Sequence, residues 1–166
     1  MLYLLDASVL ITASSTYYQL DQVPEFWEWL VHVAEEGNAK VVEEVYEEFK
    51  DGDDLLGEWA RRADVKAAIV LRESVDVNLA RRVTRTGYAE DLTDDELVKL
   101  GRDPFLIAYG LVDIRNRTIV TAEVSRPGKQ RGNRRIPNVC ETLGVRWCDT
   151  FGFTAALSFS TRWKRR

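Results

Sequence analysis

Acidic residues recur at one kind of position in this chain, at or just beyond the end of a short apolar segment. The positions are Asp6, the four glutamates between 43 and 48, Glu123 and Asp149. Carboxylates that gather within a few ångströms repel one another unless a proton or a cation neutralises them. Their hard oxygen atoms are the ligands that Mg²⁺ and Mn²⁺ prefer. Such ions activate water and stabilise the leaving oxygen of a phosphodiester, so the pattern indicates a metal-dependent nuclease.

Other catalytic chemistries lack the residues that they need. The one histidine, His32, lies in a helical segment, and we interpret it as a surface or half-buried residue, which nearly excludes a Ser-His-Asp triad. The two cysteines, Cys140 and Cys148, are expected to be free thiols, and with one histidine they are too few for a structural zinc site. The chain has no glycine-rich phosphate loop, which argues against a nucleotide-binding protein.

Strands and helices must alternate to position the acids. Four short segments predict strands, at Leu2–Leu5, Ala39–Val42, Thr118–Thr121 and Val145–Cys148. The helical patterns lie at Val23–Glu36, Glu43–Lys50, Asp54–Ala63, Lys66–Leu71 and Ser74–Thr86, from Thr93 onward, and at Asp103–Asp113 and Pro137–Leu143. Helices between strands predict an α/β fold with a largely parallel sheet. Such sheets bind ligands beyond the carboxyl ends of their strands, which is where the acids are expected.

The composition fits one globular domain. The chain has 166 residues, of which 45% are hydrophobic and 30% charged, and these values are ordinary for a folded protein. We expect a single domain over residues 1–166, with a basic loop at 126–135 and a basic and aromatic C-terminal tail at 151–166. No apolar run approaches the ~20 residues of a membrane span, and the opening residues lack the basic segment of a signal peptide. We therefore expect a cytoplasmic protein without a membrane partner.

Charge divides unevenly along the chain. Residues 1–100 carry 22 acidic residues and 10 lysines or arginines, whereas residues 101–166 carry 5 and 13. The basic residues gather in the loop Arg126–Arg135 and in the tail Arg162–Arg166. A solvated loop and a frayed terminus would explain both clusters. The functional alternative is contact with the phosphates of a nucleic acid, because lysines and arginines that displace counterions provide sequence-independent affinity.

Four segments resemble the motifs of PIN domains, and they come in that family's order. They are Tyr3–Ile11, a strand followed by Asp-x-Ser; Glu43–Gly52, in which Glu48 precedes a bulky apolar residue; Arg102–Tyr109, in which an aspartate opens a helix with an Ile-Ala step; and Val120–Glu123, a strand that ends Val-Thr-x-Glu. Cys148–Phe151 resembles the family's closing strand, which an acid often follows. Together the segments span nearly the whole chain.

The resemblance implies a PIN-like three-layer α/β/α sandwich with a central, mainly parallel sheet of about four to five short strands. It implies an endoribonuclease that needs Mg²⁺ or Mn²⁺ and leaves a 5′-phosphate and a 3′-hydroxyl. Such a protein would be the toxin of a type II toxin–antitoxin pair of the VapC kind, or would belong to a related uncharacterised PIN-like subfamily. The residues implied are the catalytic and metal-binding acids Asp6, Glu48, Asp103 and Glu123; the supporting or secondary candidates Ser8, Glu44, Thr121 and Asp149; and the RNA-binding residues Arg126, Lys129, Arg131, Arg134 and Arg135.

Several alternatives stay open at this point. Glu44 is the alternative to Glu48, because positions i and i+4 share one helix face. Asp103 could be only a helix N-cap. An inactive PIN-like scaffold that binds RNA or protein would keep the fold without the catalysis. A phosphotransferase of the haloacid dehalogenase type also has an aspartate after its first strand, but Ser8 stands where that enzyme needs a second acid.

Aromatic residues indicate a contact surface. Trp27 lies off the main apolar face of its helix, and the tail carries Phe151, Phe153, Phe159 and Trp163. Aromatic residues favour interfaces, so a homodimer or a contact with a cognate antitoxin protein is expected here, with core packing as the rival explanation.

Overall fold

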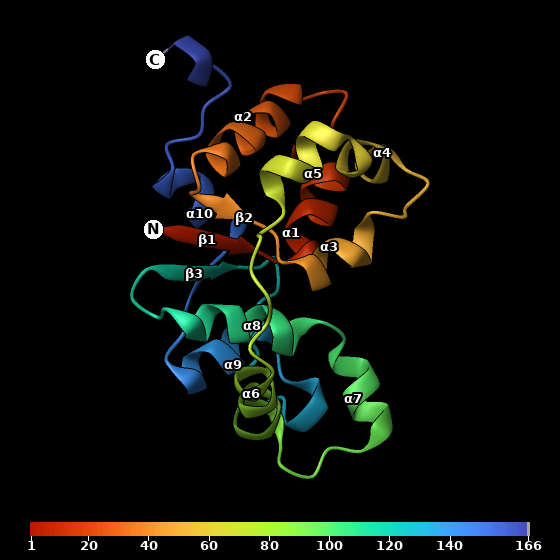
Figure 1. Ribbon diagram of the computed structural model, residues 1–166, viewed down its shortest axis with the longest axis vertical. Coiled ribbons are helices and arrows are strands. Elements are labelled where there is room, and N and C mark those ends of the chain that lie inside the picture. Colours follow the sequence, from red (N-terminus) through yellow and green to blue (C-terminus); the bar gives the residue numbers. More distant parts are fainter. Residues whose placement is uncertain (166) are drawn as a thin grey trace.

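The central sheet has four short strands, and all of them are parallel. The computed structural model describes residues 1–165, and Arg166, the last residue of the predicted tail, lies outside them. The strands are β1 (Leu2–Leu5), β2 (Ala39–Lys40), β3 (Arg117–Val120) and β4 (Arg146–Cys148), in the order β2-β1-β3-β4. Helices cover both faces of the sheet (Figure 1), so the predicted three-layer α/β/α architecture is confirmed.

The two central strands bring their carboxyl ends to the same place. Leu5 of β1 lies opposite Val120 of β3, and the next residue, Asp6, donates its backbone N–H to the Val120 carbonyl at 2.9 Å. β2 lies on one side of β1, while β3 and β4 lie on the other. The point between β1 and β3 is therefore a topological switch point, which is where parallel sheets bind their ligands.

One helical layer comes from the first part of the chain and the C-terminal helix. Its helices are α1 (Ala7–Thr12), α2 (Pro24–Glu35), α3 (Glu43–Phe49), α4 (Leu55–Arg61), α5 (Ala63–Ile69) and α10 (Thr150–Ala156). Pro24 opens α2 as predicted, and Gly37, at φ 78°, follows its end. The sequence analysis predicts neither α1 nor α10, and α1 continues as a π-helix over Ala13–Tyr17. A short apolar run such as the one after Asp6 does not by itself distinguish a helix from a strand.

The opposite layer comes from the middle of the chain. Its helices are α6 (Val77–Arg82), which continues as a π-helix over Val83–Tyr88, α7 (Asp94–Leu100), α8 (Asp103–Val112) and α9 (Ile136–Leu143). α8 packs against β1 and β3, and α9 packs against β4. Thr93 and Glu96 form the capping box that opens α7, as the sequence predicts. Short 3₁₀ turns occupy Arg131–Asn133 and Trp163–Arg165.

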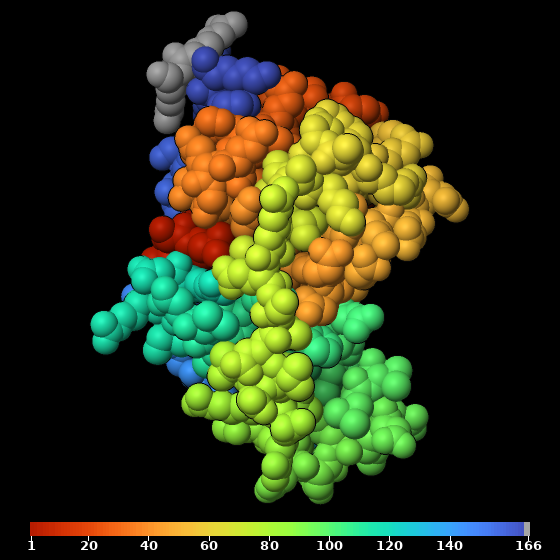
Figure 2. Space-filling view, in the orientation of Figure 1, coloured from red at the N-terminus to blue at the C-terminus, as the bar shows by residue number. Residues whose placement is uncertain are grey.

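An extended segment, residues 71–76, crosses one face of the molecule and joins the two layers (Figure 2). The Leu71 N–H donates to the Val41 carbonyl at 2.8 Å. Further along, the Glu73 carboxylate pairs with Arg117 at 2.8 Å. The predicted helix Ser74–Thr86 begins only at Val77, because the Asp76 side chain accepts the first free N–H groups of α6 and so caps it there.

A cluster of aromatic side chains joins α2 to the C-terminal segment. Trp29 is 2% exposed, and its ring centroid lies 5.4 Å from that of Phe153 and 4.9 Å from that of Phe159. Trp27 is also buried, with its ring centroid 4.8 Å from that of Trp59 and its indole N–H donating to the Tyr18 carbonyl. Core packing, the rival explanation, therefore accounts for Trp27. Among residues 1–165, no helix combines the length and the apolar character needed to cross a membrane.

Replacing Trp29 by alanine is expected to lower the free energy of unfolding by about 3–5 kcal/mol, because it opens a cavity between α2 and α10. Urea denaturation measures this loss. Val98→Ala is the matched control, since Val98 is 81% exposed, and it is expected to change the free energy by less than about 0.5 kcal/mol. Similar losses in the two variants would contradict the placement of Trp29 at the core.

Candidate functional site

Asp6 is fixed in position by two hydroxyl groups. The residue lies between β1 and α1 and is 6% exposed. Its Oδ2 atom accepts hydrogen bonds from the Ser8 hydroxyl and, at 3.0 Å, from the Thr121 hydroxyl. Burial raises the pKa of Asp6, these two hydrogen bonds lower it, and the charge of Glu123 raises it. Ser8 and Thr121 thus support Asp6 as the resemblance implies.

The Asp103 carboxylate is half-buried at the start of α8. Arg102 occupies the N-cap position, one residue before the aspartate, and the Asp103 side chain makes no capping hydrogen bond among the described residues. Burial raises the pKa of Asp103 to about 8, with further contributions from the charges of Asp6, Glu123 and Glu48. The alternative that Asp103 is only an N-cap is therefore not supported. This carboxylate lies within electrostatic reach of the other three predicted acids.

The Glu48 side chain extends from α3 to within electrostatic reach of Asp6 and Asp103. An added Cβ atom at Gly101 would lie 3.7 Å from Glu48 Oε1, so the side chain lies against the loop that leads into α8. Burial and the charge of Asp6 raise the pKa of Glu48, whereas Arg102 lowers it through its charge and its backbone N–H. Gly101 has φ 55°, a left-handed conformation that glycine adopts without strain. This turn lets the loop pass close to the carboxylate.

Glu44 lies elsewhere, although it is one turn from Glu48 on the same helix. It lines a separate cavity of about 500 Å³ together with Tyr109 and Glu73. Burial and the neighbouring Glu44 carboxylate raise the pKa of Tyr109 to about 12. The geometry therefore favours Glu48, and not Glu44, as the glutamate that joins Asp6 and Asp103.

Glu123 is near the other acids, but both of its oxygen atoms already have partners. Oε1 forms an ion pair with Arg135 at 2.6 Å, and Oε2 accepts the backbone N–H of Ile136 at 2.8 Å. Ile136 is the first residue of α9, so the carboxylate binds at the start of this helix. The side chain of Glu123 is 19% exposed.

Asp149 has a structural role at the start of α10. Its side chain accepts the backbone N–H of Gly152 at 2.7 Å, which makes it the N-cap of that helix. Its charge is not among the causes that shift the pKa values of Asp6, Glu48 and Asp103. This secondary candidate therefore lies apart from the acidic group.

The basic loop contains two kinds of residue. Arg131 pairs with Asp91 at 2.7 Å and with Glu96 at 2.9 Å, so it ties the loop to α7. Arg134 donates to the carbonyls of Gly87 and Asn138. These two arginines, predicted to bind RNA, are engaged within the protein.

The remaining basic residues face a polar cavity beside the acids. The cavity has a volume of about 270 Å³. Its lining includes Asp103, Glu123, Tyr88, Lys99, Arg126, Lys129, Arg134 and Arg135. Neither Arg126 nor Lys129 forms an ion pair with an acid among the described residues, which leaves their charges available to an anion. The cavity thus places cationic groups directly beside Asp103.

Tyr88 belongs to this site although the sequence analysis does not single it out. It ends the π-helical segment Val83–Tyr88 and lines the cavity. Its hydroxyl is buried without a hydrogen-bond partner among residues 1–165. Burial raises its pKa, and the charges of Asp103 and Glu123 raise it further. π-Helical turns are frequent at functional sites, but no residue pattern in the sequence predicts this one.

The donor set fits a hard divalent cation. Asp6, Glu48 and Asp103 offer only carboxylate oxygens. Burial raises the pKa of all three, and the charge of Asp6 raises those of Glu48 and Asp103 further, so a cation among them would stabilise the ionised forms. Within residues 1–165, no three acidic, histidine or cysteine side chains converge to form a ready-made metal cage. Mg²⁺ keeps several waters and binds one or two carboxylates directly, so the arrangement fits Mg²⁺ or Mn²⁺ held partly through water.

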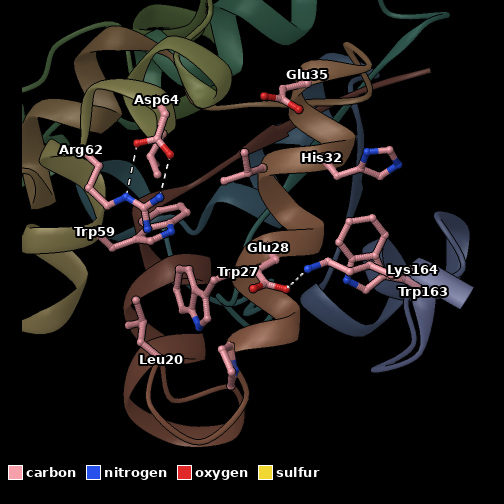
Figure 3. Close-up of a pocket in the computed structure, with 13 residues that line it drawn as sticks. Leu20, Trp27, Glu28, His32, Glu35, Trp59, Arg62, Asp64, Trp163 and Lys164 are labelled. Carbon is pink, nitrogen blue, oxygen red and sulfur yellow. Dashed lines mark hydrogen bonds and ion pairs between the residues drawn. The ribbon is translucent and has the colours of Figure 1, made fainter.

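A second hollow lies on α2, away from the acids (Figure 3). It has a volume of about 480 Å³, and its lining includes Trp27, Trp59 and Trp163. Lys164 pairs with Glu28 at 2.6 Å across its edge, and the Trp163 ring stacks on His32 with the centroids 4.7 Å apart. None of the predicted acids lines this hollow. Phe153, Phe159 and Trp163 therefore pack on α2 of their own chain, whereas Phe151 is 55% exposed and contacts Tyr17.

The model of a family described as Domain of unknown function (DUF4411) matches residues 3–161, a range that includes the whole acidic group and the cavity. No curated protein matches the chain. No solved structure matches it either.

The pKa of Asp103 predicts how stability depends on pH in the absence of metal. Because the folded protein holds the Asp103 proton up to about pH 8 and the unfolded chain loses it near 3.8, deprotonation favours unfolding between these values. The melting temperature in EDTA is expected to fall by at least about 5 °C from about pH 5 to about pH 8. Thermal denaturation followed by circular dichroism measures the slope.

Asp103→Asn is expected to flatten this pH dependence, since the amide does not titrate. Asp149→Asn removes an acid outside the group and is expected to keep the slope of the wild-type protein. A slope that is the same in all three proteins would show that Asp103 is not held protonated by its surroundings.

Proposed function

The chain belongs to the family described as Domain of unknown function (DUF4411), and we propose that it is a Mg²⁺- or Mn²⁺-dependent endoribonuclease. The observation that carries the proposal is that Asp6, which follows β1 at the switch point between β1 and β3, lies within electrostatic reach of Glu48 and Asp103. Asp6 is buried, Asp103 is half-buried and Glu48 is exposed, and burial together with the charge of Asp6 raises the pKa values of Glu48 and Asp103. Such a group is unfavourable without a cation, and groups of this kind gather at functional sites. The motif resemblance to PIN domains supports the same activity.

The chemistry requires a nucleophile and charge neutralisation at phosphorus. A Mg²⁺ or Mn²⁺ ion, when bound, would activate water as the nucleophile and offset the charge that develops on the phosphate. Asp6, Glu48 and Asp103 would hold the ion, directly or through water. Ser8 and Thr121 keep the Asp6 carboxylate in one orientation. Asp103 would lose its proton when the ion binds, because the cation replaces that proton as the neutralising charge.

The substrate binds through its phosphates in this proposal. Arg126 and Lys129 line the cavity next to Asp103 and have no acidic partner among the described residues. Such residues contact the backbone of a single strand without reading its sequence. Hydrolysis then adds water across the P–O3′ bond and leaves a 5′-phosphate and a 3′-hydroxyl.

The biological role proposed is that of the toxin in a type II toxin–antitoxin pair, with a cognate antitoxin protein as partner. This part rests on the PIN-like motifs. An RNA-degrading toxin arrests the growth of a cell that produces it without its antitoxin. Substitution of the catalytic acids would therefore also abolish the growth arrest.

A PIN-like scaffold without catalytic activity is the second candidate. The engagement of Glu123 by Arg135 and Ile136 favours it, because an acid that the resemblance assigns to metal binding has other partners here. Affinity for a divalent cation separates the two candidates. The scaffold has no need of such an ion, whereas the nuclease does.

Asp6→Asn and Asp103→Asn are expected to lower RNA cleavage by at least about 100-fold, since each removes a carboxylate charge that holds the ion. The assay follows a 5′-labelled RNA with the protein in Mn²⁺ and in EDTA. Asp149→Asn, which alters an acid outside the group, is the matched control and is expected to keep the wild-type rate. Full cleavage by the Asp6 and Asp103 variants, or in EDTA, would rule out the proposed mechanism.

Saturating Mn²⁺ is expected to raise the melting temperature by about 5–10 °C, because an ion that binds only the folded state stabilises it by about 3 kcal/mol at 100 times its Kd. Differential scanning fluorimetry measures the rise at neutral pH. Asp6→Asn is expected to abolish it. An unchanged melting temperature in the wild-type protein would favour the scaffold.

A further inference from the structure

Glu123 and Arg135 form a contact that bears on how many metal ions the site takes. Arg135 Nη1 donates to Glu123 Oε1 at 2.6 Å, and the Ile136 N–H donates to Oε2 at 2.8 Å. An ionised carboxylate with both oxygens bound to charged or helix-terminal donors is already neutralised. To bind a metal ion, Glu123 would have to release at least one of these partners.

Arg135 also acts on the neighbouring acid. Arg135, Asp103 and Glu123 line the same cavity of about 270 Å³. The guanidinium therefore lies within electrostatic reach of both Glu123 and Asp103. A second divalent cation placed at Glu123 would be repelled by this fixed positive charge, and the repulsion is strong between groups that are partly shielded from water.

The guanidinium keeps further donors for a substrate. Arginine has five N–H donors, and the structure uses one of those of Arg135, toward Glu123. The side chain is 45% exposed and lines the cavity that also contains Arg126 and Lys129. A planar guanidinium suits a phosphate oxygen better than a lysine does, because its donors lie in a fixed fork.

We propose that Arg135 stands in this site where a second metal ion would otherwise bind, so that the chain takes one divalent cation at Asp6, Glu48 and Asp103. Arg135 holds Glu123 with one N–H group and offers the others to the phosphate. In this arrangement Glu123 positions Arg135 and does not ligate metal. The inference rests on the proposed nuclease function, since without a metal at the three acids the question of a second one does not arise.

The test counts bound Mn²⁺ ions by isothermal titration calorimetry, with electron paramagnetic resonance of free Mn²⁺ as a second measure. The wild-type protein is expected to bind one ion. Arg135→Gln is expected to bind two, because Glu123 is then free of its counter-ion. Lys129→Ala removes a positive charge from the same cavity without touching Glu123 and is expected to bind one.

A second variant keeps the inference testable if Arg135→Gln does not fold. Glu123→Gln is expected to retain one ion with an affinity within about threefold of the wild-type value, whereas Asp103→Asn is expected to lower that affinity by more than about tenfold. Loss of the ion in Glu123→Gln would show that Glu123 is a ligand and would overturn the inference.

The outcomes separate this inference from the proposed function. Two ions in the wild-type protein, or one ion in a folded Arg135→Gln variant, would overturn the role of Arg135 and leave the nuclease proposal standing. No bound ion in the wild-type protein would overturn both. One ion in the wild-type and Lys129→Ala proteins with two in Arg135→Gln would support the inference.

Discussion

The repulsion among the carboxylates gathered beyond the ends of β1 and β3 is the constraint around which the rest of the site is arranged. Each acid has a neighbour that offsets its charge. Hydroxyls of Ser8 and Thr121 bind Asp6, Arg102 acts on Glu48, and Arg135 acts on both Asp103 and Glu123. These offsets are incomplete for Asp103, whose pKa stays near 8. The protein therefore retains at the sheet edge a carboxyl group that a proton or a cation must neutralise, next to a cavity with basic walls.

The basic loop combines two roles that its sequence does not separate. Arg131 and Arg134 hold the loop against α7 and α9, so they shape the cavity without supplying charge to a ligand. Arg126 and Lys129 have no acidic partner among the described residues and supply that charge. This division explains why a loop rich in arginine can border a carboxylate group without cancelling it.

The alternation of strand and helix patterns predicts the α/β fold, and the place of Asp6 directly after the first strand predicts its position. Parallel strands align their carboxyl ends irrespective of how the helices pack. The sequence pattern does not distinguish Glu48 from Glu44, because both lie on one face of α3. They differ in their neighbours, since Glu48 lies beside Gly101 in the loop before α8 and Glu44 lies beside Tyr109 of α8. The partners of Arg131 lie 35 and 40 positions earlier in the chain, which no local pattern encodes. Tyr88 is likewise placed by a π-helical turn and not by a motif.

The hydrogen bond from Thr121 to Asp6 joins residues 115 positions apart. β3 pairs with β1 across the same sequence separation. The two central strands of the sheet can therefore pair only after most of the chain has been synthesised. Pairing between distant strands is slow because the intervening chain must first be ordered. A nascent chain that has not yet exposed β3 on the ribosome can contain α1 to α8, but it lacks the strand that orients Asp6. The chemistry of the sheet edge is therefore delayed until synthesis of the protein is nearly complete.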